Sequence, residues 1–260
     1  MNQVPLKLAP LRFPLVLFDL GSTLIYFDGV WADWMQSAAL ALGDFLVNEG
    51  YPFTAQAFRE TFIPRWREIY AERDETLIEH PTAQTLAVVL AEMGFPAASP
   101  ALLRRAMRAF FGVLQPRWHV EADAHACLEA LREMGCRLGI LSNAGDDEDV
   151  QHLVDSARIR PYFDLILTSA AEGTRKPHPR IFQSALAAWG AAPEQAVMVG
   201  DLLGADILGA NRLGLRSVWI TRRASTPHNL ERLGTIVPFA SIASLAELPP
   251  LVRQWNTPPD

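Results

Sequence analysis

The stretch Leu15-Val16-Leu17-Phe18-Asp19-Leu20-Gly21-Ser22-Thr23-Leu24 joins a short apolar run to a carboxylate and then to a turn of small and polar residues. The four apolar residues, bounded by Pro14 and the Gly21-Ser22 turn, predict a buried strand of a parallel sheet. Ligands of such sheets bind beyond the carboxyl ends of the strands. We therefore expect Asp19 to lie at a binding edge, with capping of the following segment as the alternative role.

The bulk properties of the chain exclude several classes of protein. It has 260 residues, half of them hydrophobic, which suffices for one large domain or a domain with an insertion. Its formal net charge of -6 provides no electrostatic footprint for nucleic acid or an anionic membrane. No apolar run approaches the roughly 20 residues that span a bilayer, and no signal peptide pattern opens the chain. We expect a cytoplasmic protein.

Helical periodicity dominates the segment from about residue 30 to 115. The predicted helices cover 31–48, 54–70, 81–94 and 100–113. From residue 120 onward helices and strands alternate, and the predicted strands cover 137–142, 164–168, 196–200 and 216–220. Such alternation is typical of an α/β, doubly wound parallel sheet. We expect a Rossmann-like core from residues 1–27 and 116–260, into which a helical bundle of residues 28–115 is inserted.

The segment after residue 224 carries weaker signals and contains Pro227, Pro238, Pro249 and Pro250. We predict a last strand at 235–237 and a short helix at 241–247. The end of the chain, from 249 to 260, is expected to be mobile.

Several groups that can bind or react lie near the predicted strand ends. They are Asp19, the pair Ser142 and Asn143, Lys176 in the loop 173–179, and Asp201 followed by Asp206. All would meet at one edge of the sheet. A hydroxyl, an ammonium and several carboxylates there are expected where an anionic group is held beside a divalent cation. Helix capping by Ser142, Asn143 or Asp201 is the alternative for each residue taken separately.

Lysine is rare in this chain. Among the 23 basic residues only Lys7 and Lys176 are lysines, and the others are arginines. A lysine kept against such a background indicates a place that needs a compact ammonium instead of a planar guanidinium. Lys7 falls in an expected loose terminus, whereas Lys176 falls among the candidate site residues; a solvated surface position is its alternative.

Four ordered motifs resemble those of the haloacid dehalogenase-like hydrolase superfamily. They are Phe18-Asp19-Leu20-Gly21-Ser22-Thr23-Leu24, Ile140-Leu141-Ser142-Asn143, Arg175-Lys176-Pro177-His178-Pro179-Arg180-Ile181-Phe182, and Val199-Gly200-Asp201 with Asp206. The inserted helical block resembles the helical cap that members of one subfamily carry between the first and second motifs. The resemblance covers the whole predicted core.

The resemblance implies a hydrolase with Asp19 as a nucleophile that forms an aspartyl-phosphate intermediate. It also implies that Ser142, Asn143 and Lys176 bind the phosphoryl group, with Ser142 and Lys176 assisting catalysis. The implied Mg²⁺ ligands are Asp19, the backbone carbonyl of Gly21, Asp201 and Asp206. The expected substrate is a small phosphorylated or otherwise anionic metabolite.

Gly21 departs from the family pattern. Phosphatases of the superfamily usually carry an aspartate there, which protonates the leaving group and then activates water. Such assistance is typically worth about 10²- to 10⁴-fold, so we expect slow turnover or a restriction to good leaving groups. One alternative is a 2-haloacid dehalogenase-like enzyme, which needs no general acid but works without the metal that Asp201 and Asp206 suggest. Another is a catalytically impaired phosphate-binding protein.

The predicted cap also contains tryptophans and arginines that can contact an anionic substrate. These residues are Trp31, Trp34, Trp66, Arg65, Arg67, Arg104 and Arg108. Packing in the bundle core is the favoured interpretation for the tryptophans and a solvated face for the arginines, so the sequence assigns no cap residue to the substrate.

Overall fold

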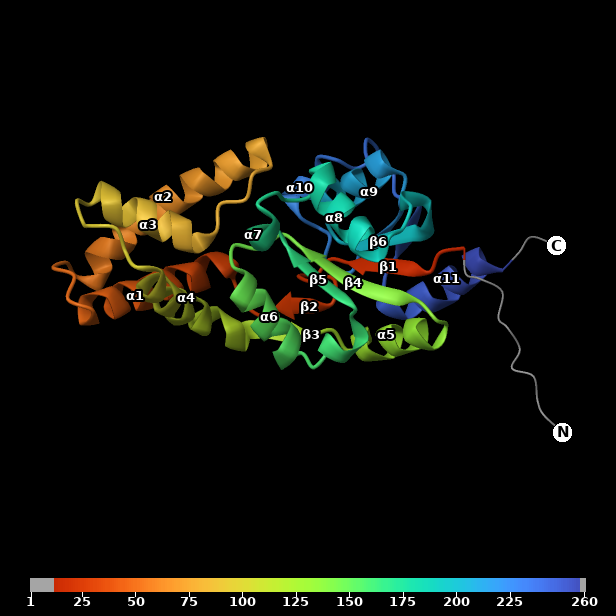
Figure 1. The fold of residues 1–260 in the computed structure, drawn as a ribbon, viewed down its shortest axis with the longest axis horizontal. Coiled ribbons are helices and arrows are strands. Elements are labelled where there is room, and N and C mark those ends of the chain that lie inside the picture. Colours follow the sequence, from red (N-terminus) through yellow and green to blue (C-terminus); the bar gives the residue numbers. More distant parts are fainter. Residues whose placement is uncertain (1–11, 258–260) are drawn as a thin grey trace.

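The computed structural model describes residues 12–257. Its core is a six-stranded sheet with the order β5-β4-β1-β6-β7-β8, in which all neighbouring strands are parallel (Figure 1). The strands are β1 (Leu15–Phe18), β4 (Arg137–Ser142), β5 (Leu165–Thr168), β6 (Ala196–Gly200), β7 (Arg216–Ile220) and β8 (Ala240–Ile242). The predicted α/β, doubly wound parallel sheet is thereby confirmed.

Helices cover both faces of the sheet. On one face lie α5 (Ala124–Glu133), α6 (Asp147–Ser156) and α11 (Leu248–Asn256), and on the other lie α8 (Pro179–Trp189) and α9 (Leu208–Leu213). Successive residues of β1 point to opposite faces, so Val16 and Phe18 pack in the first layer while Leu15 and Leu17 pack in the second. A strand buried on both faces needs a continuous apolar run, as β1 has.

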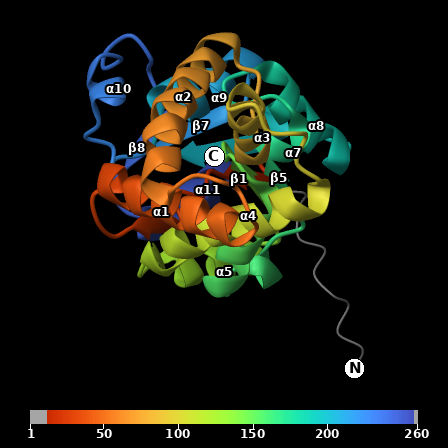
Figure 2. The same cartoon turned by 90° about the vertical axis from the view of Figure 1, so that its left-hand side faces the viewer.

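A helical block lies beyond one end of the sheet (Figures 1 and 2). It consists of α1 (Trp31–Asn48), α2 (Ala55–Thr76), α3 (Thr82–Glu92) and α4 (Pro100–Leu114). These helices share a hydrophobic cluster of their own, which includes the fully buried Leu42, Phe58, Phe62, Leu86 and Phe110. The four helices lie within residues 28–115, the range predicted for the insertion.

Two short strands join the helical block to the core. Strand β2 (Ile25–Phe27) enters the block and β3 (Trp118–Val120) leaves it, and the two pair antiparallel, with Phe27 opposite Trp118. The sequence did not predict this ribbon.

The C-terminal segment differs from its prediction. The last strand is β8 at 240–242, not 235–237, and the helix predicted at 241–247 is replaced by a short 3-10 turn, Leu245–Glu247. Residues 249–256, predicted to be mobile, belong to α11, whose first turn contains Pro249 and Pro250. Proline fits there because the first turn has no partners for its backbone N–H groups. Lys7 and residues 258–260 lie outside the described residues.

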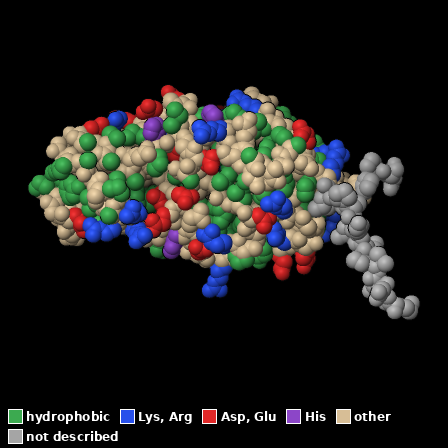
Figure 3. Space-filling view, in the orientation of Figure 1, with side chains coloured by type: hydrophobic (Ala, Val, Ile, Leu, Met, Phe, Trp, Pro, Cys, Tyr) green, Lys and Arg blue, Asp and Glu red, His purple; other side chains and the backbone are tan. Residues whose placement is uncertain are grey.

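The surface is mixed in charge on the face shown in Figure 3, where acidic and basic side chains are interspersed over the core and the helical block. Within residues 12–257, no helix combines the length and the apolar character that crossing a membrane would require.

Candidate active site

The predicted site residues converge at the carboxyl edge of the sheet. Asp19 follows β1, Ser142 ends β4, and Asp201 follows β6, while Asp206 lies in the π-helical turn Leu203–Ile207. Lys176 comes from the loop before α8. All of them, together with Gly21 and Asn143, line one cavity of about 510 Å³ between the sheet edge and the helical block.

Lys176 lies at the centre of the site and is almost completely buried, with 2% of its surface exposed. Its Nζ donates hydrogen bonds to Asp19 Oδ1 at 2.7 Å and to the Leu141 carbonyl at 2.6 Å. The same ammonium is 2.7 Å from Asp206 Oδ1. Burial of an ammonium is tolerated because two carboxylates and a carbonyl replace its water.

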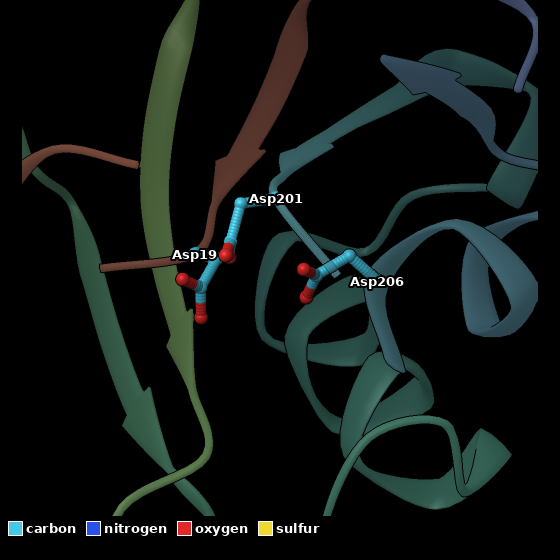
Figure 4. A group of neighbouring side chains, drawn as sticks. All are labelled: Asp19, Asp201 and Asp206. Carbon is cyan, nitrogen blue, oxygen red and sulfur yellow. The ribbon is translucent and has the colours of Figure 1, made fainter. Parts of the chain in front are cut away.

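Three carboxylates are turned toward one another in Figure 4. One oxygen from each of Asp19, Asp201 and Asp206 lies within 4.8 Å of the others. Asp206 Oδ2 accepts a hydrogen bond from the Leu202 backbone N–H at 2.9 Å, which fixes this side chain. A Cβ at Gly200 would lie 2.3 Å from the Asp206 carboxylate, so only glycine allows this close approach.

The charged groups in the cluster shift one another's pKa values. Burial raises the pKa of Asp19 to about 6, an effect that Lys176 opposes and Asp206 reinforces. Burial also raises the pKa of Asp201 well above its usual range, and the carboxylates of Asp19 and Asp206 add to this rise. Burial alone would lower the pKa of Lys176, but Asp19 and Asp206 outweigh it, so its pKa is raised. The ammonium is thus held in its charged form.

The Asn143 side chain forms two hydrogen bonds with the backbone of Lys176. Its side-chain oxygen accepts from the Lys176 backbone N–H at 2.8 Å, and its amide nitrogen donates to the Lys176 carbonyl at 2.9 Å. This pair of bonds fixes the backbone of the lysine loop against the end of β4. Ser142 and Asn143 both line the cavity.

The turn after Asp19 is bordered by an indole ring. A Cβ at Gly21 would lie 3.4 Å from Cη2 and 3.6 Å from Cζ3 of Trp118, which are ordinary contact distances. The next residue, Ser22, has a φ of 60°, in the left-handed region that favours glycine. A Cβ is therefore accommodated at position 21, next to the Trp118 ring.

The helical block is tied to the core by a buried ion-pair network that the sequence did not predict. Arg73 Nη1 is 2.6 Å from Glu79 Oε1, and the guanidinium lies over the Tyr70 ring, 3.1 Å from its centroid. The other Glu79 oxygen accepts a hydrogen bond of 2.6 Å from Ser169, which lies on the core. Arg175, next to the site lysine, is 4.0 Å from the same carboxylate. Of these residues only Arg175 belongs to a motif, and no pattern in the sequence indicates the Arg73–Glu79 pair or its contacts with the core.

Of the tryptophans considered for the cap, Trp31 and Trp66 line the cavity. Arg65 forms ion pairs with Glu68 and Glu92, and Arg108 pairs with Glu148. These two arginines are thus engaged with carboxylates of the protein.

Comparison with known proteins identifies the family. The model of the family described as haloacid dehalogenase-like hydrolase matches residues 13–214. The chain belongs to the haloacid dehalogenase-like hydrolases. Its six-stranded parallel sheet and its motifs agree with this assignment.

This haloacid dehalogenase-like hydrolase resembles both phosphatases and dehalogenases. It is 30% identical over 205 residues to the glyceraldehyde 3-phosphate phosphatase of Methanothermobacter thermautotrophicus, a match that covers 79% of the chain and 84% of the relative. It is 39% identical over 124 residues to the phosphoserine phosphatase of Thermus thermophilus, a match that covers 48% of the chain and 49%, about half, of that relative. A 2-haloacid dehalogenase from Pseudomonas syringae pv. Tomato DC3000 superposes with a TM-score of 0.65 and 25% identity, covering 94% of this chain and 99% of that one.

Proposed function

We propose that this hydrolase is a Mg²⁺-dependent phosphatase that acts on small phosphorylated metabolites through an aspartyl-phosphate intermediate. The observation that carries the proposal is the group of Asp19, Asp201 and Asp206 around Lys176 at the sheet edge. The phosphatases among the relatives support it.

The donor set fits Mg²⁺. The ion prefers oxygen ligands, and here three carboxylates face one ammonium, which leaves excess negative charge for a divalent cation to neutralise. Asp19, Asp201 and Asp206 would hold it together with the backbone carbonyl of Gly21. When bound, the ion supplies positive charge to the phosphoryl oxygens.

Four residues of the chain have separate roles in the proposed reaction. Asp19 attacks phosphorus, the bond to the leaving-group oxygen breaks, and the electron pair leaves with that oxygen. Ser142 donates a hydrogen bond to the phosphoryl group, and Lys176 keeps a positive charge beside both the nucleophile and the phosphoryl oxygens. Asn143 positions Lys176 through the two backbone bonds. Water then attacks the aspartyl phosphate and restores the Asp19 carboxylate.

The glycine at position 21 limits the rate of the proposed reaction. No carboxyl stands at this position to protonate the leaving group, so an alkoxide would depart slowly. We expect substrates whose leaving group needs little protonation, such as acyl or aryl phosphates. Residues 28–115 act as a cap that closes over the site and excludes water, while residues 1–27 and 116–260 form the catalytic core.

A 2-haloacid dehalogenase-like reaction is the second candidate, because it needs no general acid and the fold also matches a dehalogenase. Here Asp19 would attack carbon and halide would leave. The carboxylates Asp201 and Asp206 weigh against it, since this chemistry uses no metal.

Turnover of acetyl phosphate, an aryl phosphate and a 2-haloacid, each with and without Mg²⁺, distinguishes the two. We expect phosphate release that requires Mg²⁺ and is lost in Asp19→Asn. Halide release without metal would favour the dehalogenase. Phosphate release that persists in Asp19→Asn would refute the nucleophile, and phosphonate binding without any turnover would identify an impaired phosphate-binding protein.

A further inference from the structure

Three aromatic side chains form one wall of the cavity, at the junction of β2, α1 and β3. We call Phe27, Trp31 and Trp118 the aromatic wall; all three line the cavity. Their rings meet edge to face, with centroids 4.9 Å apart for Phe27 and Trp31, 5.3 Å for Phe27 and Trp118, and 6.2 Å for Trp31 and Trp118. Pairing of Phe27 with Trp118 across the β2–β3 ribbon fixes the register of the wall.

The aromatic wall borders the reaction centre. The Trp118 ring edge lies in contact distance of the position that a Cβ of Gly21 would take, two residues after the nucleophile Asp19. In the proposed reaction the leaving group departs on this side, because the acid that would protonate it belongs at position 21. Where a proton donor is usual, this chain presents an indole.

Trp31 is the part of the wall that remains open. It is 43% exposed although it lines the cavity, and its neighbour Val30 is 63% exposed. An indole at a cavity rim keeps apolar surface that a bound ring would remove from water. Offset and edge-to-face contacts between rings add to that gain.

The cationic groups of the cavity favour a substrate with a single anionic group. Among the described residues that line it, Lys176 and Arg73 are the only basic ones. Lys176 is engaged by Asp19 and Asp206, and Arg73 by Glu79. A second phosphate or a carboxylate on the substrate would thus meet no cation free of a carboxylate partner in this part of the chain.

We infer that the aromatic wall is a leaving-group subsite and that this phosphatase is specific for monophosphate esters of phenols. The inference rests on the proposed function and selects aryl over acyl and alkyl leaving groups. Attack by Asp19 breaks the bond between phosphorus and the aryl oxygen, and the electron pair leaves as an aryloxide. The aryloxide is stable enough to depart unprotonated and takes its proton from water. The ring binds against Trp31 and Trp118, which thereby determine specificity.

Binding of non-hydrolysable phosphonates to the full chain in the presence of MgCl₂, measured by calorimetry, tests the subsite without turnover. Phenylphosphonate, cyclohexylphosphonate and methylphosphonate carry the same anionic group. We expect phenylphosphonate to bind about 10- to 100-fold more tightly than methylphosphonate, from burial of the ring, and more tightly than cyclohexylphosphonate. Equal affinities for the phenyl and methyl compounds, or cyclohexylphosphonate binding as tightly as phenylphosphonate, would overturn the inference.

A matched pair of variants locates the subsite. Trp31→Leu should weaken phenylphosphonate binding about 2- to 10-fold, the range for lost ring contacts. Trp34→Leu, three residues later on α1 and outside the cavity wall, should leave that affinity unchanged. Equal effects of the two variants would place the ring elsewhere. Turnover of phenyl phosphate with MgCl₂ reports on the proposed function separately: turnover with no phenyl preference among the phosphonates refutes only the subsite, whereas a phenyl preference without turnover refutes only the phosphatase.

Discussion

Replacing Gly21 by aspartate tests whether one missing carboxyl limits this enzyme. The backbone of Gly21 is not in the left-handed region, so an L side chain is permitted there. A Cβ would meet Trp118 at 3.4 Å, an ordinary contact distance, so the side chain begins without a clash. We expect Gly21→Asp to fold and to place a carboxyl beside the departing oxygen.

The size of the gain depends on the leaving group. A positioned general acid is typically worth about 10²- to 10⁴-fold, or roughly 3 to 5 kcal/mol of barrier at 1.36 kcal/mol per tenfold. An alkyl phosphate, whose leaving alkoxide is strongly basic, should gain this full range. Acetyl phosphate releases an acetate that needs no proton, so its first step should gain little.

The assay is steady-state phosphate release, compared as kcat/KM for glycerol phosphate and acetyl phosphate. Gly21→Ala is the matched control, because it adds the Cβ without the carboxyl. We expect the ratio of the two kcat/KM values to rise at least about 100-fold in Gly21→Asp and to stay near its original value in Gly21→Ala. A folded Gly21→Asp that still hydrolyses acetyl phosphate but gains nothing on the alkyl ester would refute the missing acid as the cause.

Three further predictions concern the metal, pH and the cap contact. MgCl₂ at 100 times the Kd of Mg²⁺ should stabilise the protein by about 2.7 kcal/mol. Calorimetry should show this stabilisation as a rise in Tm that disappears in Asp201→Asn. An equal rise in Tm in Asp201→Asn would place the ion elsewhere. Burial raises the pKa of Asp149 to about 7, above the ordinary 3.8. Between these two values the folded state keeps a proton that the unfolded state loses, so the free energy of unfolding falls as pH rises from about 4 to 7. Urea denaturation should therefore show Asp149→Asn to be more stable than the wild type by about 1 to 4 kcal/mol at pH 8 and much closer to it at pH 4; the same difference at both pH values would contradict this. Glu79→Ala leaves Arg73 buried without its partner and should lower the free energy of unfolding by about 3 to 5 kcal/mol, whereas an unchanged urea midpoint would show that the pair contributes nothing.

The sheet was predictable because each of its central strands carries a local signal. Strands β1, β4, β6 and β7 have the bounds that their apolar runs predict. The ribbon of β2 and β3 was not, because three residues such as Ile25–Phe27 show no period, and their partners lie far along the chain. The expectation of a mobile end is wrong for residues 249–256, because Pro249 and Pro250 occupy the first turn of α11, where proline is compatible with a helix.

The candidate site was predictable as far as strand ends determine it. A residue that directly follows a parallel strand must lie at the carboxyl edge, so Asp19 and Asp201 are brought together by topology alone. The position of Trp118 beside the Gly21 turn, and the hydrogen bond that Ser169 donates to Glu79, depend on how the helical block packs on the core. Nothing in the spacing of those residues encodes that packing, which arises from apolar burial over many side chains.

The geometry around Lys176 gives a physical reason for a lysine at this position, in a chain whose other basic residues are almost all arginines. An ammonium concentrates its charge on one atom, and three oxygens lie within 2.7 Å of Nζ: Asp19 Oδ1 and the Leu141 carbonyl, which accept its hydrogen bonds, and Asp206 Oδ1, with which it forms an ion pair. A guanidinium spreads its charge and its five donors over a plane and does not concentrate them at one atom between the two aspartates. The compact charge thus allows the nucleophile and Asp206 to share one cation.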